Sequence, residues 1–236
     1  MRKVILLLMT LSWPVLAIST LKVTPGLSLA LYTEEYPPFN YRHEGKITGI
    51  STELITEVLS DLNFAGTFEI VPWGRAQKFT QLRANTCFFS AVRTTEREHL
   101  YQWVGPLIKE YVQLFSLDQH QHPMNHLAEA KHLRIGGQSA DAYTEHGQSL
   151  GLTIDLVAEI PVNLERLQLG RIDLWLAGSI GGPFIAARKG LTVYPVASSE
   201  QIFELWLACN RDMSPEVIVQ LNETLKKKQM HANAYP

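Results

Sequence analysis

The sequence has few cysteines, no basic stripe, and no long apolar run after its first residues. Its 236 residues carry a formal net charge of −2, and lysine and arginine do not gather into a stripe, so we expect no nucleic-acid partner. No later segment approaches the roughly 20 apolar residues that a membrane-spanning helix needs. Because no later segment could span a membrane, we predict that the mature protein is soluble.

The first residues have the layout of a secretory signal peptide. Arg2 and Lys3 precede an apolar run over 4–16, and small residues follow at Ala17 and Ser19. Polar residues and a proline interrupt the run, and no cysteine follows it to carry a lipid, so we predict a cleaved leader instead of an anchor. The predicted signal peptide is 1–17, with cleavage after Ser19 as the alternative, and the predicted location is the periplasm.

Few groups in the sequence suit catalysis or metal binding. Cys87 and Cys209 are the two cysteines, and no histidine or aspartate is tied to Cys87 by a recognisable spacing, so we expect no catalytic cysteine. His120, His122 and His126 are closely spaced, but no acidic or cysteine partner lies close by. We therefore expect no metal and no cofactor. In an oxidising compartment two cysteines often pair, and two buried free thiols are the alternative.

A helix start with a cation in its first turn stands out in the segment 87–106. Thr95 and Glu98 have the spacing of a capping box, which places the start of the helix near Thr94 or Thr95. Arg97 then opposes the helix dipole, because acidic residues are the stabilising choice there. Such an arginine beside free amide groups suits a carboxylate or phosphate ligand. The alternative is a solvated arginine that pairs with a neighbouring acid.

The order of strand and helix patterns predicts an α/β fold in two lobes of about 100 residues each. Strands are expected at 27–32, at 68–71 and, as a short apolar strand, from Cys87, with helices between them, the first of which is capped by Ser51. Further strands are expected at 111–117, 133–135, 154–157, 172–177, 192–196 and 205–209. This rhythm is typical of mostly parallel sheets flanked by helices, which bind ligands beyond the carboxyl ends of their strands. We therefore expect a cleft between the lobes.

Two segments near the expected strand ends carry aromatic and cationic candidates. The segment 33–41, TEEYPPFNY, reads as a rigid aromatic turn because its prolines restrict the backbone. Trp73 could stack on a ligand or belong to the core, and Arg75 could be a second anion contact or a surface arginine.

An ordered set of motifs resembles the extracellular solute-binding proteins of family 3, the amino-acid-binding type. The matching pieces are Tyr36-Pro37-Pro38-Phe39, 49–59 (GISTELITEVL), 72–76 (PWGRA), 93–106 (RTTEREHLYQWVGP) and 170–173 (GRID). The likeness implies the two-lobe, type II periplasmic fold, in which the chain crosses between the lobes twice. The first lobe would comprise 18–112 and 206–236, and the second lobe 113–205.

The resemblance also assigns roles to residues. It implies that Arg97, after Thr94, holds a ligand carboxylate, that Tyr36 stacks on the ligand, and that Ser90 faces it from a strand end. Val92 stands where amino-acid binders often have a hydroxyl, so its backbone amide alone could serve. The loop 139–142 corresponds to an anion-contacting helix start. Cys87 and Cys209 would lie on neighbouring strands, which makes a disulfide plausible.

One departure from the family pattern concerns the ligand's ammonium group. Amino-acid binders usually place an acid a few residues after the GRID motif, and here that position is Gly178. Asp141, or Glu34 and Glu35, could replace it; otherwise the ligand is not an ordinary α-amino acid.

Together these features predict a monomeric periplasmic protein that closes two lobes over a small carboxylate-bearing solute, such as a polar amino acid. The expected partner is an inner-membrane ABC permease, and the alternative is a membrane sensor that reads the closed form. A periplasmic enzyme on the same fold would need an acid in the cleft. Glu34, Glu35 and Asp141 are the candidates, and none has a recognisable catalytic partner, so we expect no enzyme.

Overall fold

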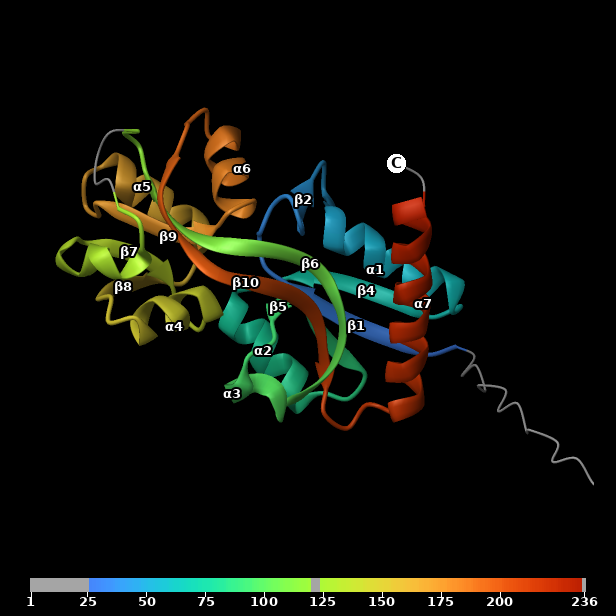
Figure 1. Ribbon diagram of the computed structural model, residues 1–236. Coiled ribbons are helices and arrows are strands. Elements are labelled where there is room, and N and C mark those ends of the chain that lie inside the picture. Colours follow the sequence, from blue (N-terminus) through green and yellow to red (C-terminus); the bar gives the residue numbers. More distant parts are fainter. Residues whose placement is uncertain (1–25, 120–123, 235–236) are drawn as a thin grey trace, which may run out of the picture.

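The computed structural model describes residues 26–119 and 124–234 (Figure 1). The predicted signal peptide and two histidines of the rejected metal site, His120 and His122, lie outside the described residues. The strands are β1 (Ser28–Thr33), β2 (Tyr41–His43), β3 (Lys46–Thr48), β4 (Ala65–Ile70), β5 (Thr86–Val92), β6 (Tyr101–Ser116), β7 (Ile135–Gln138), β8 (Ile154–Val157), β9 (Leu174–Gly178) and β10 (Tyr194–Asn210). The helices are α1 (Ile50–Asp61), α2 (Trp73–Leu82), α3 (Thr95–Glu98), the 3-10 helix η1 (Leu127–His132), α4 (Ala142–Ser149), α5 (Ile160–Gln168), α6 (Gly181–Arg188) and α7 (Pro215–Ala234). In this part of the chain, no helix combines the length and apolar character needed to cross a membrane.

Eight strands form one continuous sheet in the order β4-β1-β5-β10-β6-β9-β7-β8. The outer strands pair in parallel: β1 with β4 and β5, and β7 with β8 and β9. The two central strands, β6 and β10, are antiparallel to each other and run from one half of the molecule to the other (Figure 1). They connect the two α/β halves of the molecule.

Each half has its own apolar core. In the half that we call the first lobe, α1 and α7 pack on one side of β1, β4 and β5, and α2 and α3 lie on the other (Figure 1). In the second lobe, α4, α5 and α6 surround β7, β8 and β9. The second core includes Trp175 and Phe115, which are both fully or almost fully buried. A cleft site can therefore form where the edges of these two cores meet.

The Trp-Val-Gly-Pro motif lies within a strand, whereas the sequence placed the next strand only at 111–117. Gly105 and Pro106 lie inside β6, and the pairing of β6 with β10 shifts between Leu205 and Leu207, opposite them. Proline lacks the N–H that a central strand donates, so it is tolerated in a strand at a bulge of this kind. Likewise, the two strands expected near 192–196 and 205–209 form one bulged strand, β10.

The capping of two helices differs from the prediction. Helix α1 begins at Ile50 after Gly49, whose φ of 117° favours glycine and whose absent side chain lets the Phe39 carbonyl approach. Ser51 is thus inside the helix and buried. Helix α3 begins at Thr95 with Thr94 at its N-cap, as predicted, but the Thr94 side chain makes no cap, and Glu98 pairs with Arg93 at 2.6 Å instead of taking part in a capping box.

Candidate functional site

A small cavity lies between the two lobes and gathers most of the residues that the sequence singles out. The predicted ligand contacts along its wall are Tyr36, Trp73, Ser90, Val92, Asp141 and Gly178. Glu34, Gln138, Tyr143, Asn163 and Trp175 line it as well. Its volume of about 20 Å³ holds little more than one water molecule. The lobes are thus in a closed arrangement, and a solute the size of an amino acid requires them to part.

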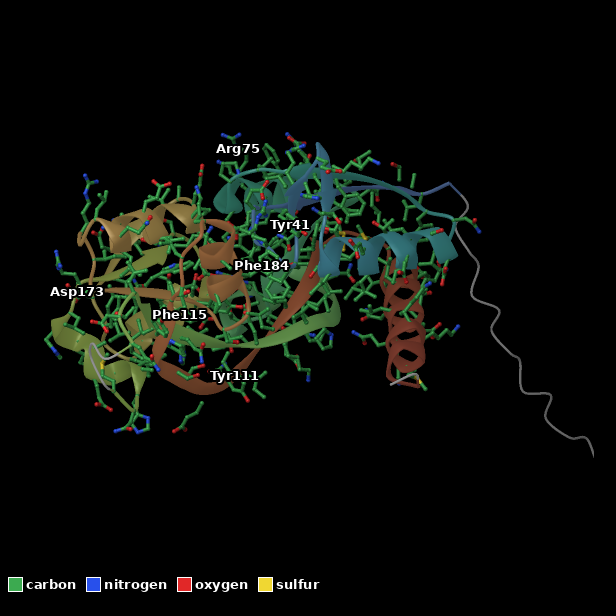
Figure 2. The ribbon with its side chains drawn as sticks, turned by 90° about the horizontal axis from the view of Figure 1, so that it is seen from above. Tyr41, Arg75, Tyr111, Phe115, Asp173 and Phe184 are labelled. Atoms are coloured by element: carbon green, nitrogen blue, oxygen red, sulfur yellow. A yellow bond between two sulfur atoms is a disulfide. The ribbon has the colours of Figure 1, made fainter. Side chains whose placement is uncertain are left out.

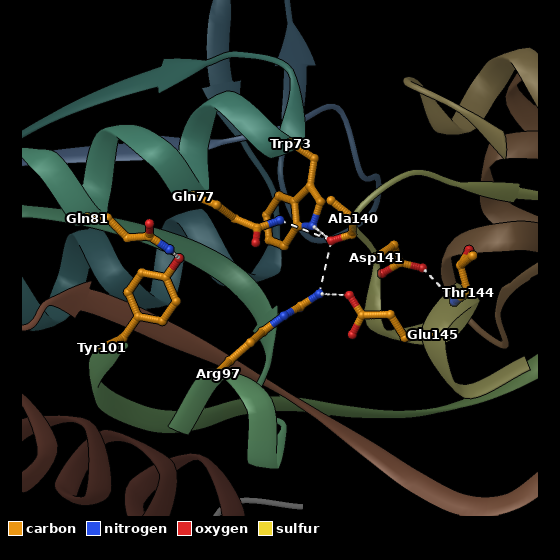
Figure 3. Close-up of polar contacts among 9 residues, drawn as sticks. All are labelled: Trp73, Gln77, Gln81, Arg97, Tyr101, Ala140, Asp141, Thr144 and Glu145. Atoms are coloured by element: carbon orange, nitrogen blue, oxygen red, sulfur yellow. Dashed lines mark hydrogen bonds and ion pairs between the residues drawn. The ribbon is translucent and has the colours of Figure 1, made fainter. Parts of the chain in front are cut away.

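Three donors of the first lobe converge on one backbone oxygen of the second lobe (Figure 3). The Ala140 carbonyl accepts from Trp73 Nε1 at 3.1 Å, Gln77 Nε2 at 3.0 Å and Arg97 Nη2 at 2.9 Å. Ala140 has a φ of 57°, a left-handed conformation that is uncommon for alanine. A neutral carbonyl oxygen has two lone pairs, so this set of donors is better matched to a carboxylate.

Arg97 is held at the centre of this contact between the lobes. Its side chain is 7% exposed and pairs with Glu145 of α4 through Nη2, at 2.9 Å. Its other terminal nitrogen, Nη1, is buried without a hydrogen-bond partner. An unpartnered guanidinium nitrogen at a buried site is costly and can be satisfied by a bidentate carboxylate. This geometry suits the role that the sequence predicts for Arg97.

Trp73 and Arg75 lie on the same helix but in different surroundings. Trp73 is 4% exposed, lines the cavity and packs edge-on against Phe88, so it serves both the site and the core. Arg75 is exposed and lies on the outer surface of the first lobe (Figure 2). The structure therefore does not bring Arg75 together with the other predicted contacts.

Ser90 and Val92 lie at the end of β5, as predicted. Ser90 has a φ of 60°, and its hydroxyl forms hydrogen bonds with Asn40 Oδ1, which accepts, and with Ser51 Oγ at 3.0 Å. Val92 is buried and lines the cavity. The hydroxyl of Ser90 is thus already committed to the first lobe.

A buried carboxylate, Glu110, ties both lobes to the connecting strand β6. Its Oε1 accepts from Tyr36 of the first lobe at 2.5 Å and from Tyr143 of the second lobe at 2.6 Å. Its Oε2 accepts from the backbone N–H of Ile180 at 3.1 Å. Burial raises the pKa of Glu110, although these hydrogen bonds oppose the shift. Tyr36, the predicted stacking residue, is thereby fixed at the cavity wall.

Glu110 explains why residue 178 is a glycine. A Cβ atom at Gly178 would lie inside the van der Waals envelopes of both Glu110 Oε2 and the Tyr36 hydroxyl. Gly181 is similarly pressed against the Tyr36 ring. The space that an acidic side chain at 178 would enter is therefore filled by a carboxylate from another strand.

We expect Gly178→Ala to destabilise the protein by about 1 to 3 kcal/mol, because the added carbon overpacks a buried site. Thermal unfolding measures the effect. Gly74→Ala is the matched control, since its Cβ would meet nothing within 4 Å, and we expect it to leave the melting temperature unchanged or slightly higher. Glu110→Ala destabilises the protein by itself because it leaves buried donors unpaired, but in a double-mutant cycle with Gly178→Ala the two losses should be less than additive. A Gly178→Ala variant that melts like the wild type contradicts the proposed close contact.

Two further carboxylates line the cavity itself. Burial raises the pKa of Glu34, which accepts a hydrogen bond from Gln138 across the cleft, and its repulsion from Asp141 adds to the shift. Burial also raises the pKa of Asp141 to about 7, although Arg97 and the amide of Thr144 lower it. Glu34 and Asp141 are the acidic side chains among the described residues that line the cavity, and no lysine or arginine lines it with them.

Sequence reasoning missed several residues that the structure places at the site. Glu110 is a lone acid in an apolar strand, and that oddity was the signal that could have found it. Gln77, Tyr143 and Glu145 lie on helices whose sequences gave no comparable signal. Across the parts of the chain that the structure describes, no group of three or more histidine, cysteine or acidic side chains could hold a metal ion.

Comparisons with known proteins agree with this architecture. Residues 29–121 match the model of the bacterial extracellular solute-binding proteins, family 3. No curated protein has a sequence that matches the chain. A histidine kinase sensor domain with similarity to periplasmic binding proteins superposes with a TM-score of 0.80 at 16% identity, over 87% of this chain and 92% of its own. Holo ArgBP from T. maritima gives 0.77 at 13% identity, over 86% and 90% of the respective chains.

A third similar structure is an ancestral amino acid-binding protein described as a precursor of cyclohexadienyl dehydratase. It gives a TM-score of 0.74 at 17% identity, over 86% of this chain and 89% of its own. The predicted two-lobe α/β fold is thus confirmed, and so is the resemblance to family 3 solute-binding proteins. The family match and the shared fold support a ligand-binding protein.

Proposed function

We propose that the protein closes its two lobes over a small solute whose carboxylate is gripped by Arg97. The observation that carries this proposal is the convergence of Arg97, Trp73 and Gln77 on the Ala140 oxygen. In the solute complex, a ligand carboxylate would take the place of this carbonyl. Contacts from both lobes would then stabilise the closed form relative to the open one.

The similar structures suggest amino acids as the first ligands to test, since one is described as an amino acid-binding protein and ArgBP from T. maritima has been solved in an arginine-bound form. A thermal-shift screen of amino acids, keto acids, dicarboxylates and small peptides tests the proposal, because a ligand that binds only the folded state raises the melting temperature. We expect at least one zwitterionic carboxylate to do so. If no carboxylate in the panel shifts the melting temperature, the proposal is wrong.

We further propose that the protein works in the periplasm as the solute-binding partner of an ABC-type permease. The alternative is a ligand-sensing module for a membrane signalling protein, which the likeness to a histidine kinase sensor domain favours. A gene for a permease beside this one would favour uptake, and an orphan setting would favour sensing. We propose no catalytic activity; recovery of the bound solute unchanged, monitored by NMR, is the expected result.

A further inference from the structure

The backbone of Tyr36 belongs to the first lobe, but its side chain packs in the second. The Tyr36 backbone N–H donates to the Asn40 carbonyl at 2.8 Å, within the turn that follows β1. The Tyr36 ring is 5% exposed and belongs to the apolar cluster that forms the core of the second lobe. Gly178 and Gly181 leave room for it, because a Cβ atom at either position would collide with the Tyr36 side chain. The ring of Tyr36 is therefore inserted into the second lobe.

The Glu110 carboxylate binds one tyrosine from each lobe through a single oxygen. Tyr36 and Tyr143 both donate to its Oε1, at 2.5 Å and 2.6 Å. Tyr143 lies on α4 of the second lobe, where its ring packs edge-on against Phe203 with the centroids 5.3 Å apart. Burial raises the pKa of both tyrosines, so each keeps the proton that it donates. The three side chains thus join the lobes at the hinge.

These contacts cannot all survive when the lobes part. Glu110 lies on β6, opposite Phe203 of β10, in the pair of strands that connects the lobes. Tyr36 moves with the first lobe and Tyr143 with the second, so the carboxylate can follow only one of them. Opening therefore breaks at least one hydrogen bond to an ionised group, and such bonds are stronger than those between neutral groups. Opening also withdraws the Tyr36 ring from its buried place.

The contacts that join the lobes at the hinge do not involve a solute. Each of them joins two groups of the chain itself, from Tyr36 and Tyr143 to Glu110. The cavity that remains between the lobes measures about 20 Å³, which is too small for an amino acid. A solute of that size must therefore enter after these contacts have opened, and part of its binding free energy offsets their loss.

We propose that Tyr36, Glu110 and Tyr143 form a latch that closes the lobes in the absence of a solute, with Glu110 as its positioning residue at the hinge. The latch goes beyond the proposed function, because it sets the proportion of closed protein whatever the solute is. A solute gains affinity only to the extent that its own contacts outweigh the latch.

Small-angle X-ray scattering of the protein with no solute added tests the latch. The wild type should scatter as the closed structure does. Tyr36→Phe combined with Tyr143→Phe removes only the donated hydroxyls, and we expect it to raise the ratio of open to closed protein about tenfold or more for each hydroxyl. Its radius of gyration should therefore be larger. Tyr111→Phe is the matched control: Tyr111 is 43% exposed on the same strand as Glu110, and this variant should scatter as the wild type does.

The possible results separate the latch from a merely structural role of the three residues. A wild type whose scattering requires open lobes overturns the latch, and so does a double variant that is as compact as the wild type. Circular dichroism checks that the variants are folded. If the double variant does not fold, Tyr36→Phe alone should shift the scattering in the same direction, and an unchanged curve overturns the latch. Because no solute is added, these results do not depend on the carboxylate grip of Arg97.

Discussion

Arg97→Ala should weaken binding of the best ligand by about 2 to 5 kcal/mol, which is roughly 30-fold to several thousand-fold in affinity. The size of the loss follows from burial, since the Arg97 side chain is 7% exposed and a ligand carboxylate beside it would be left unpaired. Arg97→Lys should recover only part of this loss, because an ammonium group cannot hold a carboxylate by two parallel hydrogen bonds. Calorimetric titration with the ligand that gives the largest thermal shift measures these affinities.

The same substitution should have little effect on folding. Glu145, the present partner of Arg97, is 47% exposed and can be solvated when the arginine is removed. Arg171→Ala removes the same charge from an exposed position in the second lobe and should leave the affinity unchanged. An Arg97→Ala protein that is folded and binds as tightly as the wild type would sink the assignment of Arg97.

The positions that sequence could predict are those where a local pattern carries the information. Arg97 was found because a cation in the first turn of a helix conflicts with the helix dipole. The placement of Ser90 and Val92 at the ligand-facing strand end followed from the resemblance to family 3, and both residues line the cavity. The fold class followed from the same rhythm and from the ordered motifs.

The positions that sequence could not predict depend on contacts made across the fold. The Ala140 carbonyl accepts hydrogen bonds from three donors because the backbone is left-handed at this residue. An alanine in a sequence gives no sign of that conformation. In the sequence, Gly178 stands where an acidic residue is expected. Only the structure shows that the Glu110 carboxylate occupies the space beside it. The length of β6 was missed because Pro106 is a strand breaker by local rules, and only the bulge against β10 accommodates it.

The disulfide of the first lobe closes a long covalent loop of the chain and should account for a large share of the protein's stability. Cys87 and Cys209 pair directly across β5 and β10, and a disulfide joins them across a sequence separation of 122 residues. In the chain-entropy treatment, opening a loop of this length costs about 4 to 5 kcal/mol, less any strain. The enclosed loop contains the whole second lobe, so the bond restrains the unfolded chain far more than the folded one.

Reduction of the disulfide should therefore lower the melting temperature by about 8 to 20 °C. Thermal unfolding with and without dithiothreitol measures the loss, and Cys87→Ala combined with Cys209→Ala should be insensitive to the reductant. Binding should change little, because Cys87 lies five residues before Val92 on β5, a distance of about 16 Å along the strand. If reduction left the melting temperature unchanged, the bond would not contribute to stability. If reduction abolished binding while the protein stayed folded, the expectation that binding is independent of the disulfide would be wrong. The disulfide would then be needed to hold the first lobe in its binding geometry, which the contacts between Arg97, Ala140 and Glu145 do not require.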